Sequence, residues 1–181
     1  MKFKLFLVLF FITSNILAQD PKSLCKIPDG VYYIVSYIDR SYVIDNSSSN
    51  VALGNNIQLW KRNNTNAQKW RIENRDGGIV FHSLNNEDYV IDNSSSRTYN
   101  GNNIVLYAKN GTNAQLWYPE KAGLGLYYYV CVLRSANNTN FVMDLSASKT
   151  VNGNNIQLWG YNKTDAQKWI ICSASVIELL E

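Results

Sequence analysis

The chain has 181 residues, of which 46% are hydrophobic and 17% charged, with 17 Lys and Arg against 14 Asp and Glu. Two of the lysines lie in an N-terminal segment that we expect to be removed, which leaves 15 basic and 14 acidic residues. A chain so close to neutrality gives no electrostatic reason to expect nucleic acid or an anionic membrane as a partner. Its length suits one domain with a substantial core.

The first 18 residues have the pattern of a secretory signal peptide. A basic start precedes an apolar run at residues 5–12, and Ala18 offers a cleavage site. The apolar run is too short to span a bilayer. We therefore expect residues 1–18 to be removed, and residues 19–181 to form a single secreted domain without membrane insertion.

From residue 24 onward the chain consists of short β-rich runs separated by turns. Such runs follow three glycines, at residues 31–35, 79–81 and 126–130. Clusters of Asn, Ser and Gly punctuate them. No segment keeps a 3.6-residue apolar period, so we predict almost no helix.

One stretch occurs three times. It opens with Gly-Asn-Asn and an Ile-x-Leu-aromatic strand, at Gly54, Gly101 and Gly153. It closes with an Ala-Gln-x-Trp segment, which ends at Trp70, Trp117 and Trp169. A strand upstream of each copy ends in an aspartate, at Asp45, Asp92 and Asp144.

The spacing of the copies predicts the architecture. Four strands in each repeat give twelve, in repeats at about residues 24–75, 76–120 and 121–178. Successive aspartates are 47 and 52 residues apart, and we place the extra residues around 134–140. Three near-equal repeats fit a closed threefold barrel better than an open solenoid, which needs capping repeats, or a propeller, which normally has more blades.

Side-chain alternation assigns the repeated residues to two faces. If Ile57 and Leu59 face the core, Gln58 and Trp60 face outward, and the third copy behaves in the same way. In the Gln-x-Trp segments the middle residue faces outward, which turns the glutamine and the tryptophan inward. We therefore expect six structural core residues: Gln68, Trp70, Gln115, Trp117, Gln167 and Trp169.

Cysteine and histidine usage limits the other chemistry. The three cysteines all lie after the signal segment, and an odd number leaves one thiol over. A closed barrel brings the two ends of the domain together, so we expect a Cys25–Cys172 disulfide and a buried free thiol at Cys131. With His82 as the only histidine, we expect no metal site and no cofactor.

An outward aspartate, glutamine and aromatic ring together suit a sugar. The carboxylate accepts charge-assisted hydrogen bonds from neighbouring hydroxyls. The amide both donates and accepts, and the flat ring covers the apolar face of a pyranose. None of these groups supplies a nucleophile or an activated water, so we expect no enzyme activity.

These motifs make the mature chain resemble, over nearly its whole length, ricin B-type lectin domains, which are β-trefoils of three Gln-x-Trp repeats. In that family the strand-end aspartate, the glutamine and the aromatic bind carbohydrate, often galactose or a related sugar. The resemblance implies three sites: Asp45, Gln58 and Trp60 in site one; Asp92 and Tyr107, with Val105 in place of the glutamine, in site two; and Asp144, Gln157 and Trp159 in site three.

The chain departs from the family pattern in two places. Family members often carry a sugar-binding asparagine immediately before the Gln of Gln-x-Trp, where this chain has Ala67, Ala114 and Ala166. The family's disulfide within a repeat is also missing, because Tyr42 and Arg62 occupy its positions. These departures leave the identity of the sugar more open than the fold.

Other interpretations remain open at this point. The aspartates are also suited to capping turns, and neighbouring loops would be able to cover Trp60 and Trp159. The alternative function is a β-trefoil protein ligand or inhibitor, such as a protease inhibitor or a toxin-like adhesion subunit. An enzyme has least support, because paired catalytic carboxylates must lie roughly 5–10 Å apart and the three aspartates belong to separate repeats. Asn46 lies in an Asn-x-Ser glycosylation sequon directly after Asp45. A glycan at Asn46 would cover site one.

Overall fold

A computed structural model describes residues 23–180, so the expected signal peptide at 1–18 lies outside the described residues. The described chain has twelve strands and only short 3₁₀ turns, as the sequence predicted. In chain order the strands are β1 Gly30–Ser36, β2 Tyr42–Asn46, β3 Asn55–Lys61, β4 Trp70–Arg75, β5 Gly78–Ser83, β6 Asn86–Asn93, β7 Asn102–Ala108, β8 Trp117–Leu124, β9 Tyr128–Ser135, β10 Phe141–Leu145, β11 Asn154–Gly160 and β12 Trp169–Ser173. Within residues 23–180 no helix has the length and apolarity needed to cross a membrane.

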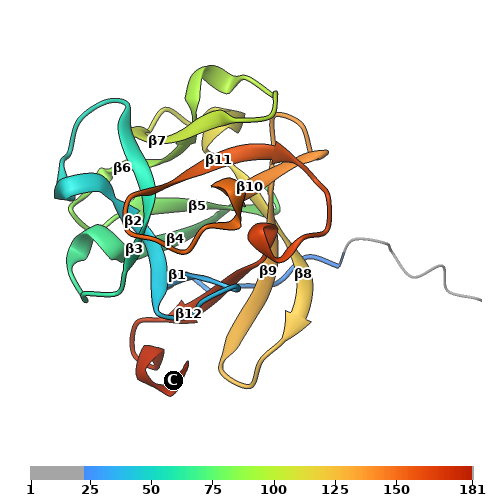
Figure 1. The fold of residues 1–181 in the computed structure, drawn as a ribbon. Coiled ribbons are helices and arrows are strands. Elements are labelled where there is room, and N and C mark those ends of the chain that lie inside the picture. Colours follow the sequence, from blue (N-terminus) through green and yellow to red (C-terminus); the bar gives the residue numbers. More distant parts are fainter. Residues whose placement is uncertain (1–22, 181) are drawn as a thin grey trace, which may run out of the picture.

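Six of the strands form a closed antiparallel barrel (Figure 1). β1 pairs with β4, β4 with β5 and β5 with β8. β8 then pairs with β9, β9 with β12, and β12 returns to β1. Closure leaves no barrel strand with an unpaired edge.

The other six strands form three hairpins that cap one end of the barrel. β2–β3, β6–β7 and β10–β11 are the hairpins, one from each repeat. Their second strands also pair with one another, β3 with β7, β7 with β11 and β11 with β3. A six-stranded barrel closed by a triangle of three hairpins is the β-trefoil that the sequence predicted.

The core joins the barrel to this cap through the three repeated tryptophans. Trp70, Trp117 and Trp169 are fully buried. Each indole N–H donates to a backbone carbonyl of a hairpin strand, to Ile44 O at 3.3 Å, Ile91 O at 3.5 Å and Met143 O at 3.1 Å. Each acceptor residue immediately precedes a repeat aspartate, so the core tryptophan fixes the strand that carries the aspartate.

The five extra residues of the third repeat lie elsewhere than predicted. Trp70 pairs with Ser83 and Trp117 with Ser135, so the longer connection is the β8–β9 hairpin and not residues 134–140. The turn of that hairpin contains Leu126 and Tyr127, both exposed, and β9 starts one residue later. The expected strand at 126–130 therefore begins at Tyr128.

The expected disulfide between Cys25 and Cys172 is wrong. All three cysteines are free, and Cys25 faces Cys131, whose Sγ donates to the Sγ of Cys25 at 3.0 Å. Side chains alternate along β12, so Trp169 faces the barrel interior whereas Cys172 joins a separate apolar cluster with Val35. Cys25 packs against the interior cluster, on the other side of the barrel wall.

Candidate functional site

Three equivalent pockets lie on the three hairpins. They have volumes of about 280, 260 and 370 Å³ for sites one, two and three. Each is lined by the strand-end aspartate, by the residue at the glutamine position and by the aromatic of its own repeat. The structure thus brings together the side chains that the sequence assigned to each site.

Strand register explains why these residues meet. Asp45 is the cross-strand partner of Gln58, and Asp144 that of Gln157. Directly opposed side chains project from the same face of a hairpin. In both sites the glutamine Nε2 donates to an aspartate Oδ1 at 2.9 Å. The aromatic stands two residues after the glutamine and therefore shares that face.

Site two differs at the glutamine position. Val105 pairs with Asp92, so the amide is missing from the wall of the pocket. Asp92 keeps the hydrogen bond from the core residue Gln115, whose Nε2 lies 2.9 Å from Asp92 Oδ2. The carboxylate therefore stays anchored in site two, and Tyr107 beside it is 39% exposed.

The core glutamines hold the loop that closes each pocket. Gln68 accepts from the backbone N–H of Asn63 at 2.8 Å and donates to Lys61 O at 3.1 Å. Gln167 makes the equivalent bonds to Asn162 and Gly160, and Gln115 to Asn110 and Ala108. A buried amide without these partners would lower the stability of the fold. The glutamine therefore fixes the conformation of the loop, and the loop in turn satisfies the glutamine's hydrogen bonds.

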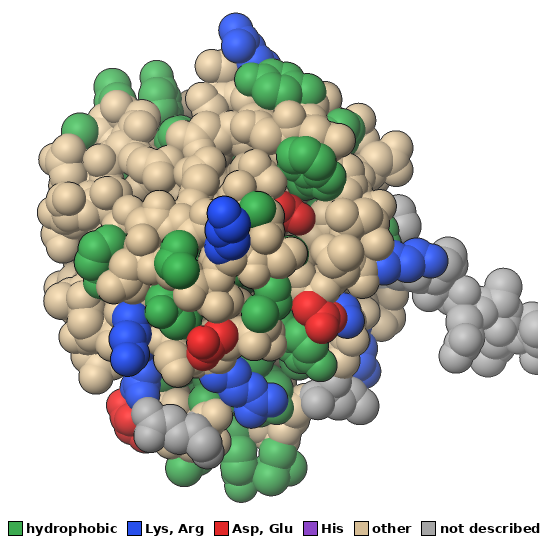
Figure 2. All heavy atoms as spheres, in the orientation of Figure 1, with side chains coloured by type: hydrophobic (Ala, Val, Ile, Leu, Met, Phe, Trp, Pro, Cys, Tyr) green, Lys and Arg blue, Asp and Glu red, His purple; other side chains and the backbone are tan. Residues whose placement is uncertain are grey.

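Burial governs the electrostatics of the three aspartates. Asp45, Asp92 and Asp144 are each 5% exposed. Desolvation raises the pKa of each carboxyl above its ordinary value, and the glutamine amides that donate to it partly offset that rise. Burial and the glutamine hydrogen bonds are the causes of these shifts in all three carboxyls. On the face of the molecule drawn in Figure 2, Lys, Arg, Asp and Glu side chains are scattered among other residues.

A loop of three small residues forms a further wall that sequence reasoning had treated only as a turn. It spans Ser47–Ser49, Ser94–Ser96 and Ser146–Ser148 in the three repeats. Its last two residues have positive φ in every copy, for example 56° at Ser48 and 54° at Ser49. Left-handed backbone in non-glycine residues costs roughly 1–3 kcal/mol and often marks functional sites. The recurrence of this loop in all three repeats is the feature of the sequence that could have indicated its place in the pockets.

An Asn-x-Thr loop also lines each pocket, and sequence reasoning likewise treated it only as a turn. In site one the Oδ1 of Asn63 accepts from the N–H of Thr65 at 3.1 Å and from its hydroxyl at 2.8 Å. The same turn recurs at Asn110–Thr112 and Asn162–Thr164. All six residues line the pockets. They offer an amide close to the place where the family asparagine is replaced by alanine.

The sequon at Asn46 is inaccessible in the folded protein. The Asn46 side chain is fully buried, and its Nδ2 donates to Asn50 O at 3.0 Å. Its Oδ1 accepts from Asn55 at 2.7 Å, which holds the serine loop of site one in place. A glycan on Asn46 would prevent this packing, so the concern that it covers site one does not apply to the folded chain.

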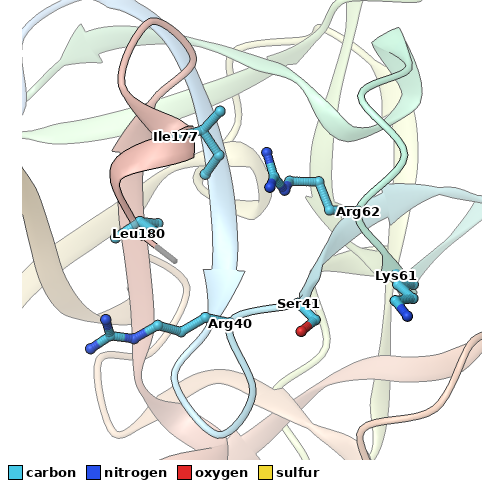
Figure 3. Close-up of a pocket in the computed structure, with 6 residues that line it drawn as sticks. All are labelled: Arg40, Ser41, Lys61, Arg62, Ile177 and Leu180. Carbon is cyan, nitrogen blue, oxygen red and sulfur yellow. The ribbon is translucent and has the colours of Figure 1, made fainter.

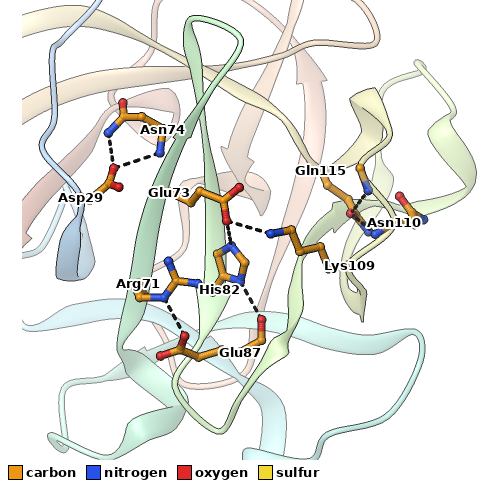
Figure 4. A network of polar contacts seen from close by, with 10 residues as sticks. Asp29, Arg71, Glu73, Asn74, His82, Glu87, Lys109, Asn110 and Gln115 are labelled. Carbon is orange, nitrogen blue, oxygen red and sulfur yellow. Dashed lines mark hydrogen bonds and ion pairs between the residues drawn. The ribbon is translucent and has the colours of Figure 1, made fainter.

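Two other polar features lie outside these pockets. A groove of about 360 Å³ is lined by Arg40, Lys61 and Arg62, and Figure 3 shows Arg40 and Lys61 directed away from its centre. Figure 4 shows buried His82 between the Glu87 carbonyl and Glu73, which also binds Lys109. Among residues 23–180, no group of three or more His, Cys, Asp or Glu side chains is placed to hold a metal ion.

Solved structures confirm the fold. A designed threefold-symmetric protein, ThreeFoil, is 23% identical with a TM-score of 0.70, over 80% of this chain and 99% of its own. The Rhizoctonia solani agglutinin is 21% identical with a TM-score of 0.67, over 83% and 99%. The Macrolepiota procera ricin B-like lectin, solved with lactose, is 18% identical with a TM-score of 0.66, over 82% and 99%.

Sequence comparison identifies the family. No curated protein matches the chain. The profile of the family described as ricin-type beta-trefoil lectin domain-like matches residues 23–107 and, overlapping, 66–159. These matches cover most of the chain and all three repeat aspartates. The chain therefore belongs to the ricin-type beta-trefoil lectin domain-like family.

Proposed function

We propose that the protein is a secreted, non-catalytic lectin that binds carbohydrate in these three pockets. One observation carries the proposal: two independent repeats place an anchored carboxylate, an amide and a half-exposed indole on one face, with the same 2.9 Å Gln–Asp hydrogen bond. Ile57 and Leu59, on either side of Gln58, belong to the apolar core, whereas Gln58 and Trp60 line the pocket.

The chemistry of each group fits a pyranose. Glutamine amides anchor each carboxylate, and the lone pairs that they do not use would accept from adjacent sugar hydroxyls. Trp60 and Trp159 offer a flat face for the C–H side of the ring. A galactose-type sugar is our first expectation, supported by a structurally similar lectin solved with lactose.

The number of carboxylates in each pocket argues against glycoside hydrolysis. Among the described residues, each pocket is lined by a single carboxylate. Glycosidases commonly need two, one as acid and one as base or nucleophile, roughly 5–10 Å apart. The pockets therefore suit reversible binding with release of an unchanged sugar.

A glycan array with matched variants tests the function. The wild-type mature protein should bind a defined set of glycans, and a Trp60→Ala/Trp159→Ala double variant should lose binding to the galactose-type glycans that sites one and three take. Tyr127→Ala is the control, because Tyr127 is an exposed aromatic outside all three pockets. Equal binding by the double variant and the wild type, or release of reducing sugar by the wild type, would contradict the proposal.

A further inference from the structure

Sites one and three present a hydrogen-bond acceptor that site two lacks. Because the Nε2 of Gln58 is engaged by Asp45, its Oε1 is left toward the pocket. That oxygen would lie 3.9 Å from a Cβ built on Gly153, in the neighbouring repeat. Gln157 Oε1 has the same relation to Gly101. In these two sites the wall between repeats is therefore polar.

The corresponding wall of site two is apolar. Val105 and Gly54 both line the pocket, and Val105 is 6% exposed. A Cβ built on Gly54 would meet nothing within 4 Å, so no side-chain oxygen occupies the place taken by Gln58 and Gln157 elsewhere. Asp92 and Tyr107 remain in place, which keeps the carboxylate and the ring.

We infer that site two is not a weakened copy but a pocket of different preference: it takes a sugar that turns a methyl group toward Val105. This inference rests on the proposed function and deepens it. A sugar hydroxyl packed against valine methyls loses its water partners and gains none, whereas a methyl there buries apolar surface. Two kinds of sugar carry such a methyl, a 6-deoxyhexose and an N-acetylhexosamine.

The expected discrimination follows from the size of the change. One methyl group in an apolar pocket is worth roughly tenfold or more in selectivity. Site two should therefore prefer the methyl-bearing sugar by about tenfold over the parent hexose. Sites one and three should show no such preference, because their glutamine Oε1 accepts from a hydroxyl.

Site-resolved NMR titration tests this without first changing the chain. The probes are galactose, 6-deoxygalactose and N-acetylgalactosamine, which share one stereochemistry. The Val105 methyl signals report site two, and the indole N–H signals of Trp60 and Trp159 report the other sites. We expect the Val105 signals to respond at about tenfold lower concentration to at least one methyl-bearing sugar, and which one responds identifies the source of the methyl.

Reciprocal variants complete the test. Val105→Gln should give site two the preference of the other sites, and Gln157→Val should give site three the preference for a methyl. Both residue types already occur at this register position, so the fold accommodates either. If Val105 responds to galactose at least as readily as to both other sugars while Trp60 and Trp159 respond, the inference fails and the lectin function stands. If no pocket responds to any sugar, both fail.

Discussion

At the scale of single residues, each repeat aspartate combines the binding role proposed for it with an energetic cost of burial. Its carboxylate is almost wholly buried, and desolvation raises its pKa. A group whose folded pKa is raised above its unfolded value contributes stability at low pH and loses it as the pH rises through the folded pKa. The charged form that would bind sugar is thus the form that folding disfavours.

The pH dependence of binding should show this conflict. As the pH falls through the raised pKa of Asp45 and Asp144, the carboxyls take up protons and lose acceptor capacity. Affinity for sugar should therefore begin to fall at a higher pH than an ordinary aspartate would produce. Calorimetric titrations at a series of pH values measure this, and constant affinity down to the ordinary aspartate range would contradict it.

Replacing the same aspartate should separate binding from stability. Asp45→Asn keeps an oxygen for Gln58 and removes a buried charge, so the free energy of unfolding at neutral pH should be unchanged or higher. Sugar binding at site one should nevertheless weaken, because the charge-assisted hydrogen bonds are lost. Urea unfolding and sugar titration of the same variant check both parts; a large loss of stability would indicate a structural role instead.

The two classes of tryptophan should respond differently to truncation. Trp70→Ala empties a fully buried site and removes the hydrogen bond to Ile44 O, which should cost about 3–5 kcal/mol of unfolding free energy. Trp60→Ala, at a partly exposed position, should cost far less. Urea denaturation of the two variants makes the comparison, and similar losses would mean that Trp60 belongs to the core.

At the scale of elements, alternation within a strand was predictable and pairing between repeats was not. The faces of Ile57 and Gln58 followed from the two-residue period alone. The position three residues after each core tryptophan faces away from the barrel interior, which we did not use to place Cys172. At this position Glu73 pairs with His82 and Glu120 with Arg134. Cys172, at the same position of the third repeat, packs with Val35 in an apolar cluster. An alignment of the three repeats makes Cys172 equivalent to Glu73 and Glu120. That equivalence predicts that Cys172 faces the outside of the barrel, away from Cys25.

The thiol pair that does meet should be open to oxidation. Cys25 is half-buried, and its hydrogen bond from Cys131 holds its pKa below the ordinary thiol value, whereas that bond and burial raise the pKa of Cys131. Oxidised glutathione should therefore join Cys25 to Cys131, as the two thiols lose two electrons and two protons and glutathione disulfide becomes two thiols. Peptide mapping should find this bridge with Cys172 free; a Cys25–Cys172 bridge would contradict the structure.

At the scale of the whole molecule, three repeats distribute the pockets over three hairpins around one axis. The hairpins β2–β3, β6–β7 and β10–β11 come one from each repeat. The number of strands and the closed barrel followed from threefold repetition in the sequence, and the family resemblance named the side chains that line the pockets, whose role in binding stays a prediction. The loop walls at Ser47–Ser49 and Asn63–Thr65 did not, because turn composition does not say which pocket a turn borders.

Separate pockets matter most on a surface that carries many sugars. A single shallow pocket of this kind should bind near 1 mM, which corresponds to about −4 kcal/mol. Two pockets that engage one surface together gain on the order of a hundredfold or more, provided that the sugars span them. On a galactose-coated surface, sites one and three should supply this gain, because both keep the glutamine.

Single variants on that surface should therefore rank the sites. Trp60→Ala or Trp159→Ala alone should reduce retention on galactose beads by about a hundredfold, yet leave monovalent binding at the unchanged site. Tyr107→Ala should change retention little, because Val105 gives the hydroxyls of galactose no acceptor in site two. Surface plasmon resonance at high and low galactose density separates the avid from the monovalent component. If Tyr107→Ala were the most damaging of the three, the glutamines at 58 and 157 would not be what makes a site strong for galactose.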